Sequence, residues 1–98
     1  MSNCWKDLER RVAKSLNGRR NSRGNDFGQS MPDVEHPLLS IECKYRAKIS
    51  GFLKYGIRQA EKYHPEKIPA LILKEKNMQG ELVVMRLSDF QKLFERIL

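Results

Sequence analysis

The sequence predicts a mixed α/β fold, an α+β mixed sheet with helices, in one domain that covers residues 1–98. A chain of 98 residues has room for a single domain with a modest core. Three segments carry apolar residues at helical spacing, and four shorter segments are apolar or alternate in the manner of strands. With one more short strand expected after the first helix, the predicted order is α, β, β, β, α, β, β, α.

The residues before Asn17 predict the first helix. Ser2 or Asn3 can cap it, and the pair Asn17-Gly18 is a stop signal after about Leu16. At about 100° per residue, its apolar side chains fall within one arc, which we expect to be buried. These side chains are Trp5, Leu8, Val12 and Leu16.

Glu9 projects only about 20° outside that apolar arc. A carboxylate beside a core face is costly to bury unless it is paired or binds a cation. Glu9 is therefore a candidate site residue. The alternative is an edge residue that reaches solvent or pairs with an arginine.

Residues 17–31 contain three glycines, three arginines and few side chains that can pack. This composition predicts a flexible basic loop, with a short strand near Phe27. A loop of this length in a small domain is usually functional. Because the planar arginine fork suits phosphate, we expect contact with phosphodiesters, and a loop that is merely solvated is the alternative.

Two neighbouring strands are predicted next. Pro32-Asp33-Val34 begins the first, and His36-Pro37 turns the chain into the second, residues 39–46. The second alternates between apolar and polar residues, so we expect one core face and one charged face, with Glu42 and Lys44 together on the charged face. The core face comprises Leu39, Ile41, Cys43 and Tyr45.

A second helix is predicted from about Phe52 to Tyr63 or His64, where Pro65 ends it. Gln59 projects into the middle of its apolar arc. A glutamine on a buried face needs a hydrogen-bond partner, so Gln59 is either a satisfied core amide or part of a site. The arc comprises Phe52, Tyr55, Gly56, Ala60 and Tyr63.

The last third predicts a hairpin and a helix. Two apolar strands, residues 69–74 and 81–86, are joined by a short turn at residues 77–80. Ser88 and Gln91 fit a capping box for the last helix. Its apolar residues are spaced for burial or for sharing with a second copy of the chain, and they are Phe90, Leu93, Phe94, Ile97 and Leu98.

The charge of the chain is unevenly distributed. A net charge of +7, with a pI near 9.7, predicts an anionic partner. Successive blocks, residues 1–24, 25–43, 44–62 and 63–98, carry +5, −4, +5 and +1. A purely electrostatic nucleic-acid binder gains nothing from the acidic block, because carboxylates repel phosphate. An enzyme that holds a divalent metal against phosphate needs such an acidic block. The alternative is that these acids simply lie in turns or on the surface.

Asp33 and Glu42, on neighbouring predicted strands, are candidate ligands for Mg²⁺. This ion prefers oxygen ligands and keeps several waters, so one or two carboxylates and a substrate phosphate suffice to hold it. Lys44 shares a face with Glu42, where it can orient the attacking water or stabilise developing charge.

The combination of Pro32-Asp33, Glu42-Cys43-Lys44 and the helix-one acid Glu9 resembles the PD-(D/E)xK nuclease superfamily. The resemblance covers nearly the whole chain. It implies a restriction-endonuclease-like αβββαβ core, here followed by a C-terminal helix. It also implies a Mg²⁺-dependent endodeoxyribonuclease, a phosphodiester hydrolase in which Mn²⁺ can replace Mg²⁺.

The resemblance assigns roles to individual residues. Asp33 and Glu42 would bind the metal together with the backbone carbonyl of Cys43. Glu9 would complete the metal shell, although Asp26 competes with it for this role. Gln59 would hold water or the catalytic Lys44 in place.

This small chain has a helix-one glutamate and an Arg/Gly/Ser-rich loop. In both features it resembles Holliday junction resolvases and stand-alone phage nucleases, which are enzymes of DNA recombination and repair. This likeness implies a homodimer that acts on branched DNA, such as a four-way junction. The residues that we expect to contact DNA are Arg10, Arg19, Arg20, Arg23, Arg46, Lys48, Lys54 and Arg58.

Two other functions are left open by the sequence. A nonspecific or flap-type DNA nuclease would cut linear duplex as fast as a junction, and a catalytically inactive DNA-binding module would bind without turnover. The chain has no secretory signal and no apolar stretch of about 20 residues, so we expect a soluble cytoplasmic protein without membrane contact. Cys4 and Cys43 are then expected to be free thiols.

Overall fold

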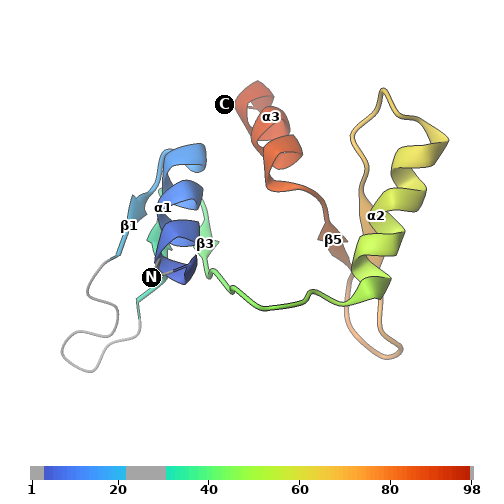
Figure 1. Ribbon diagram of the computed structural model, residues 1–98, viewed down its shortest axis with the longest axis horizontal. Coiled ribbons are helices and arrows are strands. Elements are labelled where there is room, and N and C mark those ends of the chain that lie inside the picture. Colours follow the sequence, from blue (N-terminus) through green and yellow to red (C-terminus); the bar gives the residue numbers. More distant parts are fainter. Residues whose placement is uncertain (1–3, 22–30, 98) are drawn as a thin grey trace. The chain divides into compact units, whose positions relative to one another are not determined.

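The computed structural model describes residues 4–21 and 31–97 (Figure 1). The chain divides into two compact units at Ala47 and Lys48. Among the described residues the order of elements is α, β, β, β, α, β, β, α, which matches the predicted order except that the first strand lies at Arg19–Arg20 and not near Phe27. Strand pairing within the described residues is antiparallel throughout and falls into two separate sheets, where the sequence predicted one mixed sheet. The helices and small sheets are compatible with the predicted α/β class.

The first unit begins with helix α1, Cys4–Leu16. It ends where predicted, because Asn17 adopts the left-handed conformation (φ 58°) and the N–H of Gly18 donates to the carbonyl of Ala13 at 2.8 Å. Cys4 and Cys43 are not joined in a disulfide bond, as expected.

The buried face of α1 lies toward its C-terminal end and consists of Glu9, Val12, Ala13 and Leu16. The expected burial of Trp5 is wrong, since this side chain is 52% exposed. The helix packs on strands of only two residues each, about 7 Å long, which are too short to cover a helix of about 20 Å. The Trp5 ring instead lies 5.1 Å from the ammonium of Lys6.

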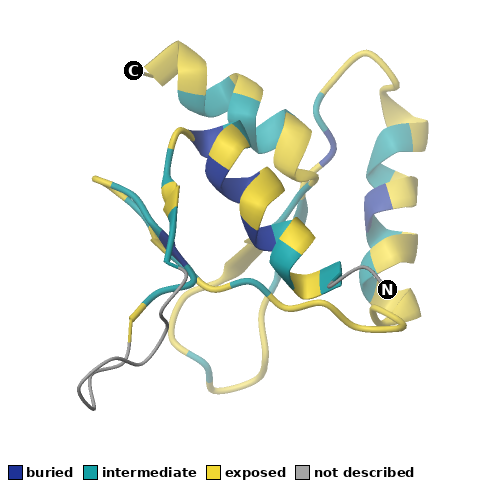
Figure 2. Ribbon diagram, turned by 60° about the vertical axis from the view of Figure 1, so that its left-hand side comes forward, coloured by how far each residue is buried: buried dark blue, intermediate teal, exposed yellow. Residues whose placement is uncertain are grey.

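Three short strands complete the first unit: β1 (Arg19–Arg20), β2 (Val34–Glu35) and β3 (Ser40–Ile41), in the order β1-β2-β3. The sequence predicted loop where β1 lies, and the strand expected near Phe27 falls outside the described residues. Val34 pairs with Arg20 and Ile41 and is fully buried, and its strand β2 packs against α1. Figure 2 shows buried residues, in dark blue, along α1. The core of this unit is therefore centred on β2 and α1.

The strand predicted over residues 39–46 ends at Ile41. The cause is local, because the N–H of Cys43 donates to the side chain of Asp33 rather than to a neighbouring strand. The predicted alternation nevertheless persists in burial: Leu39, Ile41 and Cys43 are half-buried and the residues between them are exposed. Tyr45, expected in the core, is 57% exposed.

The second unit contains helix α2 (Gly51–Tyr63), strands β4 (Leu71–Leu73) and β5 (Leu82–Val84), and helix α3 (Leu87–Ile97). The two strands pair antiparallel, with Leu71 opposite Val84. Asn77 and Gly80, with φ of 69° and 74°, shape the predicted turn between them. α2 packs on β4, where a side chain on Gly56 would meet Leu71 at 2.7 Å.

The buried side of α2 is rotated by about 90° around the helix axis from the predicted arc, of which only Gly56 and Ala60 belong to the packed side. Ile57 is buried and Leu53 and Ala60 are half-buried, whereas Gln59 is exposed. Aliphatic side chains and Gly56 allow the close approach to β4 that aromatic rings would prevent. The aromatic side chains of the predicted arc are exposed by 67% (Phe52), 62% (Tyr55) and 75% (Tyr63).

Helix α3 starts two residues earlier than the predicted capping box requires. The N–H groups of Asp89 and Phe90 donate to the carbonyl of Arg86, so Ser88 lies inside the first turn and the box is wrong. The rings of Phe90 and Phe94 are 5.5 Å apart and half-buried. No described residue of α3 is fully buried, so its apolar face is only partly covered within the unit.

Candidate active site

Asp33 lies directly before β2 and joins the two halves of the predicted motif. Its Oδ2 atom accepts a 2.7 Å hydrogen bond from the backbone N–H of Cys43. The backbone of Asp33 is held on both sides, because its carbonyl accepts from Asn21 and its N–H donates to Ile41, each at 3.0 Å. The carboxylate is thereby fixed beside the segment Glu42-Cys43-Lys44.

The pKa of the Cys43 thiol is influenced by three carboxylates. Burial raises the pKa of Cys43 above its ordinary value, and the negative charges of Asp33, Glu9 and Glu42 raise it further, in that order. A thiol with a raised pKa stays protonated at neutral pH and is a poor metal ligand. The charges of all three predicted acids therefore act on this one thiol.

Glu42 and Lys44 lie on the solvent side of this cluster. The ammonium of Lys44 is 3.1 Å from Oε2 of Glu42, in agreement with the shared face that the sequence predicted. Their side chains are 60% and 70% exposed, so the pair contributes little to stability. The same exposure leaves both groups accessible to a substrate from solution.

Glu9 is buried on α1, and its partner is an arginine. Nε of Arg20, on β1, donates to Oε1 of Glu9 at 2.8 Å, and both side chains are largely buried. This pairing is the alternative that the sequence left open for Glu9. It also engages the Arg20 guanidinium, which was expected to contact DNA.

Asn21 is a residue of the site that the sequence reasoning missed. Its backbone bonds to Asp33, and its side-chain Nδ2 is buried without a hydrogen-bond partner among the described residues. A buried donor without a partner costs free energy unless a ligand or water satisfies it. Nothing in the local pattern distinguishes Asn21, because its position depends on the pairing of β1 with β2.

The oxygen ligands at this cluster suit a hard cation. In residues 4–21 and 31–97 no three His, Cys, Asp or Glu side chains are arranged to hold a metal ion. Mg²⁺ does not require such a cage, since it keeps several waters and is bound by one or two carboxylates with substrate phosphate. Asp33, Glu42 and the Cys43 carbonyl therefore fit a partial shell that substrate would complete.

The basic residues of the first unit, and Lys48 at the start of the second, differ in how they are engaged. Arg10 pairs with Asp7 at 3.0 Å and Arg19 with Glu35 at 2.6 Å, both exposed to solvent. Arg46 and Lys48, in the segment that follows the motif, are exposed. Arg23 and Asp26 lie outside the described residues.

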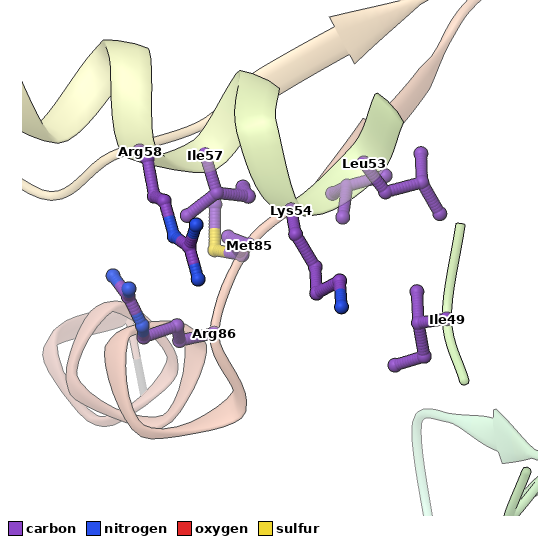
Figure 3. Close-up of a pocket in the computed structure, with 8 residues that line it drawn as sticks. Ile49, Leu53, Lys54, Ile57, Arg58, Met85 and Arg86 are labelled. Atoms are coloured by element: carbon purple, nitrogen blue, oxygen red, sulfur yellow. The ribbon is translucent and has the colours of Figure 1, made fainter. Parts of the chain in front are cut away.

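Lys54 and Arg58 belong to the second unit and border a pocket of about 380 Å³ (Figure 3). Figure 3 shows both side chains extending from the same side of α2, with Arg86 approaching from the end of β5. Arg86 is paired with Glu61 at 2.7 Å, whereas neither Lys54 nor Arg58 has an acidic partner among the described residues. The pocket is otherwise lined by Ile49, Leu53, Ile57, Val84 and Met85.

Gln59 also belongs to α2 and is exposed rather than held in a core. It lines an open groove of about 330 Å³ with Tyr55, Arg58, Lys62 and Tyr63. The reading of Gln59 as a satisfied core amide is therefore wrong.

No protein-family model, curated protein or solved structure matches the chain. Among the residues that the structure describes, none of the helices combines the length and the apolar character needed to cross a membrane.

Proposed function

We propose that this chain is a metal-dependent DNA endonuclease with a restriction-endonuclease-like core of the PD-(D/E)xK type, acting on branched DNA. The observation that carries the proposal is the hydrogen bond from the Cys43 N–H to Asp33, which brings the Pro-Asp and Glu-x-Lys segments together. The combined influence of Asp33, Glu9 and Glu42 on one thiol supports it. A chance occurrence of the two motifs would not require their acids to converge.

Asp33 and Glu42, with the backbone carbonyl of Cys43, would hold Mg²⁺ or Mn²⁺, which prefer oxygen ligands. When bound, such an ion lowers the pKa of its water and offsets charge on the phosphate. Glu9 would contribute from the buried side of the cluster, with Arg20 fixing its carboxylate. The donor of Asn21 would find its partner in a water or a phosphate oxygen.

Lys44 would orient the attacking water or stabilise the negative charge that develops on the phosphate. Its ammonium is mobile enough to leave Glu42, because an exposed ion pair is weak. Gln59 belongs to the second unit, and its expected role beside Lys44 stays a prediction.

The substrate would be bound through its backbone by the basic residues outside the cluster, because counterion release favours contact between Lys or Arg and phosphate. The exposed members of this set among the described residues are Arg10, Arg19, Arg46, Lys48, Lys54 and Arg58. Arg20 is better assigned to Glu9 than to DNA.

A homodimer would place two such sites on one four-way junction. The surface that would be shared is an apolar groove between β5 and α3, where Val83, Leu87 and Ile97 are exposed. α3 has no fully buried residue, so a second copy would supply the cover that one chain lacks.

The test is cleavage of labelled DNA with Mg²⁺, Mn²⁺ or EDTA by the wild type and by Asp33→Asn, with Glu35→Gln as the matched control. Glu35 is two residues away and loses the same charge, but it pairs with Arg19 outside the cluster. We expect Asp33→Asn to cut at least about 100-fold more slowly and the control to cut normally. Equal cleavage by the wild type and Asp33→Asn would refute the proposal.

The substrate in that assay should be a panel of four-way junction, flap and linear duplex. Preferential cutting of the junction would support the resolvase assignment, whereas equal cutting of linear duplex would assign a nonspecific nuclease. Binding without cutting in any metal would assign an inactive DNA-binding module.

A further inference from the structure

The solvent side of α2 carries two adjacent stripes of side chains, one cationic and one aromatic. Lys54, Arg58 and Lys62 follow one another at intervals of four residues, so they rise along one side of the helix by about 6 Å per step. None of the three has an acidic partner in the described part of the chain. Three aligned cations therefore face solvent unpaired.

This alignment is unfavourable for the free protein. Like charges four residues apart on a helix repel each other. A bound anionic ligand would offset this repulsion, because each cation would then be attracted to the ligand. A linear polyanion fits best, because it can meet successive positions along the helix.

The aromatic stripe lies immediately beside the cations. Tyr55 and Tyr63 are 62% and 75% exposed, and they line the 330 Å³ groove together with Gln59, Arg58 and Lys62. Arg58 borders this groove on one side and the aliphatic pocket of Figure 3 on the other. One helix thus offers charges for a backbone and ring faces for stacking.

The combination of rings and cations in one groove favours single-stranded over double-stranded nucleic acid. Bases in a duplex are stacked on each other and present only their edges, so an aromatic side chain cannot stack on them. Unpaired bases expose their faces, and proteins bind single strands by combining a basic groove with aromatic platforms. The amide of Gln59 can add a hydrogen bond to a base edge at the same place.

We propose that α2 binds single-stranded DNA, with the backbone along Lys54, Arg58 and Lys62 and unpaired bases stacked on Tyr55 and Tyr63. The choice of DNA rests on the proposed function. The site would give the enzyme affinity for the unpaired segments of branched substrates, independently of the carboxylate cluster.

The test is fluorescence anisotropy of a labelled oligothymidylate in EDTA, so that no cleavage occurs. The double variant Tyr55→Leu/Tyr63→Leu removes both ring faces and keeps side chains that favour a helix. The matched control Tyr55→Phe/Tyr63→Phe keeps the rings. We expect the Leu variant to bind at least about tenfold more weakly and the Phe variant to bind like the wild type.

Two further readouts separate stacking from simple loss of fold or charge. A 2-aminopurine base in the oligonucleotide should be quenched by the wild type and the Phe variant but not by the Leu variant. Affinity for a blunt duplex should be unchanged in the Leu variant, which also shows that it is folded. An equal loss on duplex, or unchanged binding of the single strand, would overturn the proposal, and much tighter binding of the matching RNA would overturn the choice of DNA.

The nuclease proposal can fail separately. If the wild type cuts no DNA in Mg²⁺ or Mn²⁺ but shows the expected loss in the Leu variant, the single-strand site stands and the nuclease is refuted. If the wild type cuts DNA and the Leu variant binds single strands normally, the opposite conclusion follows.

Discussion

The backbone N–H of Cys43 donates to Oδ2 of Asp33 at 2.7 Å. A side chain thus takes the hydrogen bond that a strand carbonyl would otherwise accept, and β3 ends at Ile41 for this reason. The same contact holds the Asp33 carboxylate beside the backbone of Cys43, the residue between Glu42 and Lys44. The end of the strand and the convergence of the motif are therefore two effects of one hydrogen bond.

This hydrogen bond predicts a difference between two substitutions of Asp33. Asp33→Ala leaves the half-buried Cys43 N–H without an acceptor and should lower the free energy of unfolding by about 1–3 kcal/mol. Asp33→Asn retains a side-chain oxygen and should cost less. Urea denaturation measures both, with Glu35→Ala as a surface control. Equal destabilisation by Ala and Asn would show that the hydrogen bond does not hold the segment.

The thiol of Cys43 gives a prediction in pH. Because burial and three carboxylates raise its pKa above 9.0, the thiol is protonated more firmly in the folded chain than in the unfolded chain. The stability linked to this group is complete below pH 9 and is lost as the pH rises through the raised pKa.

Alkylation of Cys43 by iodoacetamide measures this shift in metal-free Cys4→Ser protein. Its rate should reach half-maximum above pH 9, and Asp33→Asn should lower that midpoint by removing one of the charges. The same protein in urea supplies the unshifted reference. A folded-state midpoint at or below the value in urea would contradict the proposed gathering of carboxylates.

The pair between Glu9 and Arg20 predicts a large effect on stability. Each side chain is mostly buried, so Arg20→Gln leaves a buried carboxylate unpaired and should cost about 3 kcal/mol. Arg19→Gln is the matched control, because Arg19 is the neighbouring residue and its pair with Glu35 is exposed. Urea denaturation should show a loss of less than about 1 kcal/mol for this control. If Arg20→Gln and Arg19→Gln had equal free energies of unfolding, the buried pair would stabilise the fold no more than the exposed pair does.

The sequence predicted features that depend on neighbours along the chain. Asn17-Gly18 marked the end of α1, and the helical angle of Glu9 identified its position beside the core. The partner of Glu9 was not predictable in this way. Arg20 is 11 residues away and reaches Glu9 only because β1 folds back against α1.

The prediction of which side of α2 is buried was wrong for a different physical reason. Periodicity locates an apolar arc, but Tyr55 and Tyr63 are amphipathic and lie beside an aliphatic arc of comparable width. Gly56 borders both arcs, and the close approach of Leu71 to this residue is part of what fixes the packed side. That contact joins segments 15 residues apart and is invisible to a local pattern.

Two glycines give matched predictions about packing. A Cβ atom on Gly18 would lie 2.7 Å from the carbonyl oxygen of Glu35 and 2.8 Å from Val34, whereas one on Gly51 would meet nothing within 4 Å. Gly18→Ala must displace β2, whose backbone cannot yield as a side chain would, and should cost about 1–3 kcal/mol. Gly51→Ala should be neutral or slightly stabilising, since alanine favours the helix. Thermal unfolding of both variants is the measurement, and a tolerated Gly18→Ala would argue against close packing of β2.

The groove between β5 and α3 predicts a dimer that one substitution can disrupt. Ile97 lines this groove and is 80% exposed, so Ile97→Lys should leave the fold of a single chain intact while placing a charge in the apolar surface. Light scattering should give twice 11.5 kDa for the wild type and 11.5 kDa for the variant. Ile72→Lys is the control, because Ile72 is 60% exposed on β4 but does not line the groove. A monomeric wild type would remove the dimer from the proposed function, and a dimer that survives Ile97→Lys would place its interface elsewhere.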